Sequence, residues 1–411
     1  MFKKHYKNKL FIIFTIFNIS FISLLFSQNL TDVTHKVITA KDVKVGAERT
    51  KQYFPFLKDK NVAIVANQTS MIGNVHLVDS LLRAGIKVKK IFCCEHGFRG
   101  EKEAGEHIKS YIDTKTKLPV ISLYGKNLKP QKSYLKDVDV IIFDIQDVGV
   151  RFYTYISTLH YIMEACAENN IPLLVLDRPN PNGYYIDGPV LEKKYSSFVG
   201  VDPIPVVYGM TIAEYACMLN GEAWLKKGIK CDLKYVTVDN YNHTYHYILP
   251  INPSPNLKTM DAIYLYPSLG LLEGTKISVG RGTDYPFQII GCPDLKNTDF
   301  SFTPRSIKGE CSDPPYKGIK CNGYNLSNFA DNYIKNIKRI YLFWLTGTYE
   351  EVSDKNDYFN SSFFDKLAGT SKLRQQIING ISEEEIRKSW IPDIEKFKKI
   401  RKKYLLYPDF E

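Results

Sequence analysis

Continuous apolar runs alternate with segments of helical periodicity between residues 60 and about 240. Such runs predict strands buried on both faces, and the segments between them predict the helices that cover a parallel sheet. The predicted strands are Val62–Ala66, Lys89–Cys94, Val120–Leu123, Val138–Asp144, Leu173–Leu176, Ile204–Val207 and Asp232–Val238. The predicted helices are His76–Ala84, Thr154–Asn169 and Thr211–Leu225. We therefore expect an α/β protein with a Rossmann-like, doubly wound, mostly parallel sheet.

The pattern changes after about residue 255, where the turn-rich segment INPSPNLKTMD predicts a linker. Beyond it lie two strand-like runs and two segments of helical periodicity. The strand-like runs are Ala262–Tyr266 and Phe287–Gly291, and the helical segments are Asn325–Lys338 and Ser371–Asn379. We expect a Rossmann-like domain over 45–255 and a smaller α+β domain over 256–411 that completes a cleft. The basic segment Lys396–Lys403 predicts a solvated helix face.

The first 28 residues have a basic start, an apolar run from Leu10 to Phe26, and then small and polar residues. This layout predicts a signal peptide that is removed on export to the periplasm or the medium. The alternative is a retained membrane anchor. Asn18 and Ser20 interrupt the apolar run, and a polar segment follows it, which favours cleavage and no stable membrane insertion afterwards.

Net charge, missing motifs and cysteine spacing argue against several classes of protein. The formal net charge of +11 becomes +7 without the four lysines of the leader, a weaker and less concentrated charge than a nucleic-acid binder carries. No GxGxxG follows the first strand, and no P-loop, HExxH or GxSxG motif is present, so no cofactor is expected. The eight cysteines contain no CxxC pair. Cys311 and Cys321, which flank a Pro/Gly-rich loop, are the best candidates for a disulfide.

Polar residues follow four of the predicted strands, at the edge where an open α/β sheet binds its ligands. They are Asn67 and Gln68, then Glu95, His96 and Arg99, then Asp144, Gln146 and Asp147, and finally Arg178 and Asn180. Because four strands deliver carboxylates, amides and arginines to the same edge, we expect an active cleft there.

Two glutamates are the candidate catalytic carboxylates. Glu95 directly follows an apolar strand, where partial desolvation would raise its pKa toward that of a general acid. Glu164 shares a helix face with His160 and would supply a second carboxylate if that face looks into the cleft, as glycoside hydrolysis requires. The alternatives are a surface pair for His160 and Glu164, and a loop salt bridge between Glu95 and Arg99.

Other readings of the same residues remain open. Glu95, His96, Asp144 and Asp147 could instead ligate a divalent metal. Arg281, between Gly280 and Gly282, is suited to binding a carboxylate with two parallel hydrogen bonds, or else marks a structural turn.

Long strings of the sequence resemble the NamZ-type exo-β-N-acetylmuramidases of glycoside hydrolase family 171. Among them are FCCEHGFRG, DVDVIIFDIQDVGVRFYTYISTLHYIMEAC, VLDRPNPNG, PIPVVYGMTIAEYA and LEGTKISVGRGT, and the resemblance runs from about Val45 to near the C-terminus. It implies a catalytic site in a cleft between two domains. It also implies removal of β-1,4-linked N-acetylmuramic acid from the non-reducing ends of peptidoglycan fragments, which makes muramyl saccharides the expected partners.

The resemblance also assigns roles to residues. Glu95 in EHGFRG and Glu164 in MEAC match the positions that we expect to be catalytic. The expected substrate-binding residues are Asn67, Gln68, His96, Arg99, Asp144, Gln146, Asp147, Arg151, Tyr153, Asn180 and Arg281. Several aromatic side chains (Phe98, Tyr124, Tyr153 and Tyr208) are expected to offer faces to a sugar ring. A metal-dependent hydrolase and a non-catalytic peptidoglycan-binding protein are the competing hypotheses.

Overall fold

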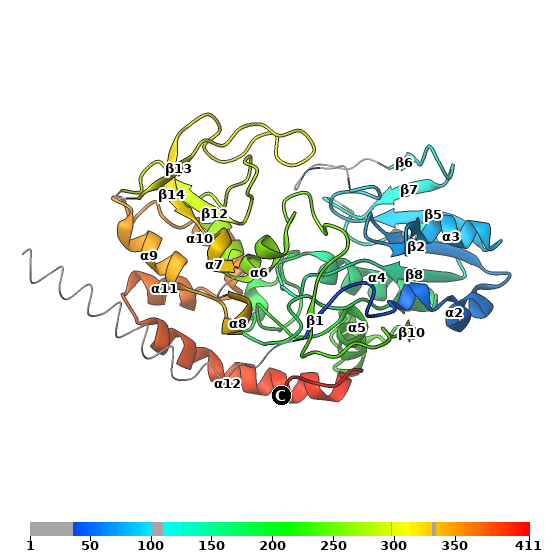
Figure 1. The fold of residues 1–411 in the computed structure, drawn as a ribbon. Coiled ribbons are helices and arrows are strands. Elements are labelled where there is room, and N and C mark those ends of the chain that lie inside the picture. Colours follow the sequence, from blue (N-terminus) through cyan, green and yellow to red (C-terminus); the bar gives the residue numbers. More distant parts are fainter. Residues whose placement is uncertain (1–35, 101–102, 104–109, 126, 297, 331–333) are drawn as a thin grey trace, which may run out of the picture. The chain divides into compact units, whose positions relative to one another are not determined.

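The computed structural model describes residues 36–100, 103, 110–125, 127–296, 298–330 and 334–411. Val37–Glu411 form one compact unit, and the fold described below is that of this unit (Figure 1). The predicted leader, residues 1–28, lies outside the described residues. No helix in the part of the chain that is described has both the length and the apolar character needed to span a bilayer.

A seven-stranded sheet organises the first part of the unit, with strand order β10-β9-β8-β2-β5-β7-β6. The strands are β2 (Asn61–Ala66), β5 (Lys87–Cys93), β6 (Tyr111–Ile112), β7 (Pro119–Ser122), β8 (Val140–Asp144), β9 (Leu173–Leu176) and β10 (Leu233–Val236). All pair in parallel except the short edge strand β6, which is antiparallel to β7. This confirms the Rossmann-like α/β class predicted from the apolar runs.

The direction of winding reverses between β2 and β8. From β2 the chain proceeds outward to β5 and β7, and it then returns to the other side of β2 to form β8, β9 and β10. The register of the two central strands pairs Val62 with Val140 and Ala66 with Asp144, so both end at the same level. Because the loops leaving the two strands diverge, this reversal point is where a doubly wound sheet opens a crevice.

Helices cover both faces of the sheet (Figure 1). On one face, α2 (Thr50–Leu57) and α3 (Leu77–Arg83) bury their apolar side chains against Val62, Ile64 and Ala66. On the other face, α4 (Tyr155–Asn169) and α5 (Ile212–Gly221) pack against the alternate residues of the same strands. Strands that are buried on both faces account for the continuous apolar runs in the sequence.

The second, smaller part combines a small antiparallel sheet with helices. Its sheet has the order β12-β14-β13, and α6 leads into it. The elements are α6 (Met260–Leu269), β12 (Ile289–Cys292), β13 (Phe300–Phe302), β14 (Cys321–Asn325), α7 (Ser327–Phe329), α8 (Lys335–Ile337), α9 (Phe343–Glu351), α10 (Ser361–Ala368), α11 (Lys372–Ile378) and α12 (Glu383–Arg401). One apolar cluster contains residues from α4, α6, α10 and α12, so a single core runs through both parts.

Two-residue strands complete the structure. β1 (Val37–Ile38) pairs in parallel with β11 (His246–Tyr247), and β3 (Met71–Ile72) forms a hairpin with β4 (Val75–His76).

Three local expectations are wrong. Ala262–Tyr266 belongs to helix α6, because Thr259 caps this segment by accepting a hydrogen bond from the Ala262 N–H, and the helix is buried on all sides. A short apolar run cannot by itself distinguish a buried helix from a strand. Ile204–Val207 makes only isolated bridges through Val207 instead of a strand. Cys311 and Cys321 are free thiols.

The C-terminal segment that follows α12 returns to the first part of the chain (Figure 1). The Tyr407 hydroxyl donates to Asp177 Oδ2 at 2.6 Å and accepts from the Val238 N–H at 2.8 Å. Burial raises the pKa of Asp177 to about 6, against hydrogen bonds that lower it, from Tyr407 first. Arg401, buried at the end of α12, donates to the Gly209 carbonyl at 2.8 Å. These buried polar contacts fasten the chain terminus to the sheet.

We expect Tyr407→Phe to lower the free energy of unfolding by about 1–3 kcal/mol, because Asp177 and the Val238 N–H both lose a buried partner. Denaturant unfolding would measure this loss. Tyr404→Phe is the matched control, since Tyr404 in the same segment is only partly buried and donates to the partly exposed Glu222. Equal losses for the two variants would contradict this account.

Candidate active site at the carboxyl edge of the sheet

Glu95 lies just past the end of β5, where the chain turns sharply. His96 and Gly97 adopt left-handed conformations, with φ of 69° and 77°. A non-glycine residue in this region carries strain, and such strain is common at functional sites. Glu95 is half-buried, and its Oε1 accepts from the Tyr124 hydroxyl at 2.9 Å while Oε2 accepts from Thr154 Oγ1 at 3.3 Å. The turn therefore presents a carboxylate that two hydroxyls orient.

The residues after β2 and β8 form hydrogen bonds with one another where the direction of winding reverses. Asn67 Oδ1 accepts from the Thr69 N–H and hydroxyl, and its amide donates to the Tyr155 hydroxyl at 3.1 Å. Thr69 in turn accepts from the Gln146 N–H at 3.0 Å. The Gln146 amide donates to the Pro179 carbonyl at 2.7 Å. Asn67 and Gln146 are buried, and we call this buried, hydrogen-bonded layer beside Glu95 the floor of the site.

Two residues expected to bind substrate, Gln68 and Tyr153, form hydrogen bonds with the predicted linker. The Gln68 amide donates to the Asn252 and Pro253 carbonyls, each at 3.1 Å. The Tyr153 hydroxyl also donates to the Pro253 carbonyl, at 2.8 Å. The turn-rich segment predicted near residue 255 is thereby fixed against the edge of the sheet.

The arginines and amides of the neighbouring loops are also engaged internally. Arg151 is fully buried and donates to the carbonyls of Pro189, Ile204 and Leu367. Asn180 is buried and donates to the Met210 carbonyl at 2.8 Å. This geometry gives Arg151 and Asn180 structural roles and does not support direct contact with a substrate.

A buried ion pair joins the ends of β8 and β9. Arg178 donates from Nε and Nη2 to the two oxygens of Asp144, at 2.6 and 3.0 Å, and from Nη2 to the Met71 carbonyl. Asp144 has no exposed surface, so it acts on the site by fixing this loop.

Asp147 is buried, and its environment favours the protonated acid. Burial raises its pKa to about 7, although hydrogen bonds from Tyr208 and from the Gly149 and Val148 N–H groups act to lower it. Its Oδ1 has no hydrogen-bond partner among the described residues. Gly149 has φ of 76°, and a Cβ there would lie within 2.4 Å of the Asn180 amide, which explains a glycine after this aspartate.

Glu164 is not close to Glu95. Thr154, which contacts Glu95, is the N-cap of α4, and Glu164 lies ten residues further, roughly 15 Å along the helix axis at about 1.5 Å per residue. Burial would raise its pKa, but hydrogen bonds from His160, Lys129 and the Lys226 N–H lower it to about 2. The expected pairing of Glu95 and Glu164 is therefore not supported by this geometry.

His160 belongs to the same buried network. It lies between Asp202 and Glu164, with ring nitrogens 3.0 and 3.3 Å from their oxygens. Burial would lower its pKa, but hydrogen bonds with these two carboxylates raise it to about 9. His160 and Glu164 thus form a buried charged network instead of the surface pair that was the alternative.

Tyr266 on α6 is a site residue that the sequence did not point to. Its ring contacts Tyr153 and Phe287, with centroids 5.9 and 4.9 Å away. Burial raises its pKa well above 10, and the nearby charges of Glu273, Glu95 and Asp147 act in the same direction while Arg281 opposes them. Its ring therefore lies between an aromatic residue of the first part of the chain and one of the second part. Because the sequence predicted a strand here, no pattern marked this side chain.

Fewer aromatic faces are available than expected. Phe98 and Tyr208 are fully buried, and Tyr153 is nearly so, whereas Tyr124 is half-buried. His96 is buried beneath the turn at Glu95. Within the described ranges, no cluster of three or more His, Cys, Asp or Glu side chains is placed to hold a metal ion. The alternative in which Glu95, His96, Asp144 and Asp147 ligate a metal is thus not supported by their placement.

The fold and the site together define a Rossmann-like α/β protein in which an acidic site takes the place of a nucleotide site. The chain belongs to the exo-β-N-acetylmuramidase NamZ family. The model of the family's N-terminal part matches residues 62–261, and that of its C-terminal part matches residues 264–407. The chain is thus a member of a glycosidase family over most of its length.

Individual relatives agree with this assignment. The chain is 39% identical to the peptidoglycan beta-N-acetylmuramidase NamZ of Bacillus subtilis (strain 168), over 93% of this chain and 94% of that protein. Two crystal structures of DUF1343 family proteins from Bacteroides fragilis NCTC 9343 have the same fold. One is 48% identical with a TM-score of 0.83 and the other 30% identical with a TM-score of 0.73. They cover 90% and 89% of this chain, and each is itself 99% covered.

We expect Asp147→Asn to flatten the pH dependence of stability between about pH 4 and pH 7. The folded protein keeps the Asp147 proton up to about pH 7, whereas the unfolded chain loses it near the ordinary value of 3.8. Stability of the parent protein should therefore fall as pH rises through this window, and the asparagine variant should lack that contribution. Unfolding free energies measured across the window would test this, and an unchanged slope would contradict it.

For Glu164→Gln we expect a loss of about 3–5 kcal/mol of stability at neutral pH, because His160 and Lys129 lose a buried anionic partner. The pKa of Glu164 is lowered, so this contribution is present above about pH 4.5 and disappears as pH falls toward 2. Chemical unfolding at pH 7 and pH 3 would measure both values. A variant as stable as the parent at pH 7 would refute this role.

Proposed function

We propose that this chain is an exo-acting β-N-acetylmuramidase that releases N-acetylmuramic acid from the non-reducing ends of peptidoglycan fragments. Membership of the family over most of the chain supports the reaction class. One geometric observation supports the site: Glu95 is a half-buried carboxylate oriented by two hydroxyls at the edge where such a sheet binds its ligands.

Glu95 is the general acid that donates a proton to the glycosidic oxygen as the bond to the leaving sugar breaks. A general acid must reach the leaving oxygen, and Glu95 retains exposed surface, whereas Asp144 and Asp147 are buried. Hydrogen bonds from Tyr124 and Thr154 fix the orientation of its two oxygens, so the carboxyl group is pre-organised for proton transfer. A hydroxyl donor on each oxygen also offers hydrogen bonds to the anion that forms after proton transfer.

Muramic acid is an acidic sugar, and the chain carries an excess of positive charge that favours encounter with an acidic wall polymer. The basic start and apolar run of residues 1–28 support export to the periplasm or the medium, where the polymer is located. Both features are consistent with an enzyme of peptidoglycan turnover and cell-wall recycling.

Glu95→Gln should lower kcat for release of N-acetylmuramic acid from a muramic-acid-terminated disaccharide by at least about 10²-fold, because the sugar leaving group needs a proton that the amide cannot supply. Thermal unfolding should show the variant as stable as the parent. Asp393→Asn, an exposed acid on α12, is the matched control and should keep full activity.

Two results would redirect the assignment. Turnover that a chelator abolishes would favour the metal-dependent hydrolase. Binding of peptidoglycan fragments without any turnover in the parent protein would favour the non-catalytic binding protein.

A further inference from the structure

Three of the four arginines near the site have their guanidinium groups committed within the protein. Arg99 donates from Nε and Nη2 to Asp113, at 3.3 and 3.0 Å. Arg178 binds both oxygens of Asp144, and Arg151 is fully buried against carbonyls. None of these three presents both terminal nitrogens to a ligand.

Arg281 differs from these three. Its Nε donates to Glu273 Oε1 at 2.6 Å, and its guanidinium lies over the Phe287 ring, 5.0 Å from the centroid. Within the described part of the chain, neither terminal nitrogen has a hydrogen-bond or ion-pair partner, and the side chain is 19% exposed. Gly280 and Gly282 have φ of 78° and 76°, so the backbone turns on both sides of the arginine.

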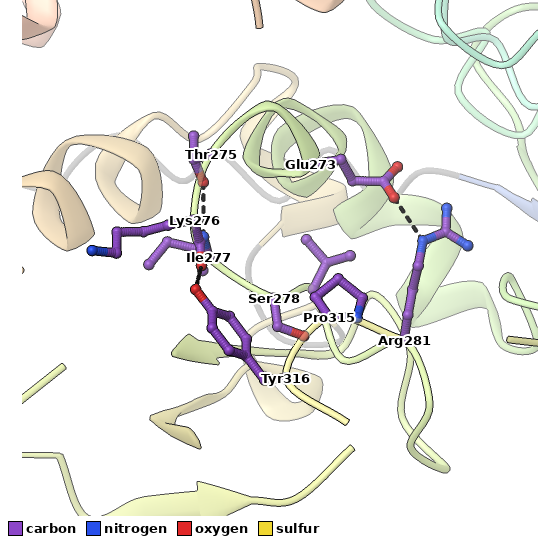
Figure 2. Close-up of a pocket in the computed structure, with 9 residues that line it drawn as sticks. Glu273, Thr275, Lys276, Ile277, Ser278, Arg281, Pro315 and Tyr316 are labelled. Atoms are coloured by element: carbon purple, nitrogen blue, oxygen red, sulfur yellow. Dashed lines mark hydrogen bonds and ion pairs between the residues drawn. The ribbon is translucent and has the colours of Figure 1, made fainter. Parts of the chain in front are cut away.

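The close-up in Figure 2 shows how the side chain is oriented. Arg281 and Glu273 lie together at one side of a cavity of about 140 Å³, away from Thr275 and Lys276 (Figure 2). The terminal nitrogens point away from the other labelled residues (Figure 2). Lys276 is itself paired with Asp294 at 3.4 Å and with Asp357 at 3.7 Å. Arg281 is therefore the cation on this wall that is available to an anion.

Tyr266 links this arginine to the catalytic carboxylate. Its ring lies against the Tyr153 ring, with centroids 5.9 Å apart, and Tyr153 directly precedes Thr154, whose hydroxyl donates to Glu95 Oε2 at 3.3 Å. Its ring touches Phe287, over which the Arg281 guanidinium lies. A continuous series of aromatic contacts thus runs from Tyr153, beside the Glu95 contact residue Thr154, through Tyr266 and Phe287 to the Arg281 guanidinium.

Resting on the proposed function, the structure assigns Arg281 to recognition of the lactyl carboxylate of muramic acid. With Nε fixed by Glu273, the two terminal N–H groups form a planar fork that matches the two oxygens of a carboxylate. Glu273 and the Phe287 ring position the fork. The lactyl carboxylate distinguishes muramic acid from N-acetylglucosamine, so this contact selects the sugar that is released.

The test compares two para-nitrophenyl N-acetyl-β-muramides, one with a free lactyl carboxylate and one in which it is amidated. For the parent protein we expect a higher kcat/KM on the free acid. Arg281→Met should lower kcat/KM on the free acid by roughly 10- to 100-fold, which is the range for a lost hydrogen bond to a charged group. The kcat/KM on the amidated compound should change by less than about threefold. Arg305→Met is the matched control, because Arg305 pairs with the exposed Asp284 and should not alter the preference.

The outcomes separate this inference from the function itself. A parent protein that hydrolyses neither compound overturns the proposed function. A parent protein that hydrolyses both equally, or an Arg281→Met variant that loses equal activity on both, overturns the role of Arg281 alone. If Arg281→Met does not fold, Arg281→Lys is used. The lysine keeps the charge without the planar fork, so its preference for the free acid should be smaller than that of the parent.

Discussion

The buried pair of Arg178 and Asp144 is the constraint on which the site depends. Asp144 ends β8 at the point where the winding reverses, and Arg178 follows β9. A charge with no exposed surface must be paired, and loss of one partner costs about 3–5 kcal/mol. The pair therefore fixes two adjacent loops in one arrangement. The Arg178 contact with the Met71 carbonyl extends this to the loop after β2.

Around this pair, polar side chains form hydrogen bonds within the protein instead of with solvent. Asn67, Gln146 and Asn180 are buried and hydrogen-bonded, so they form a rigid floor. Glu95, next to these residues, keeps accessible surface. Rigidity matters here because the roles proposed for Glu95 and Arg281 require each group to be held in a fixed orientation.

Much of the architecture was predictable because buried parallel strands have a simple signature. The runs that became β2, β8 and β9 are apolar without alternation, β5 ends in an apolar run, and polar residues follow each of them. Glu95 could be identified in the same way, as a carboxylate directly after a strand. Glu164 could not be placed from its spacing, because helix periodicity gives a face and does not say which neighbour covers it. Lys129 and the Lys226 N–H cover it.

The sequence by itself determined the fold class and the edge of the sheet that carries the polar residues, since each depends on short-range patterns. Only the tertiary structure decided which of those polar residues are buried in the floor and which stay accessible. It also decided that Tyr266, more than 150 residues from Glu95, packs against Tyr153 at this edge of the sheet. Burial and packing of these residues depend on hydrogen bonds and ion pairs between segments that are far apart in the sequence. No local sequence pattern specifies such contacts.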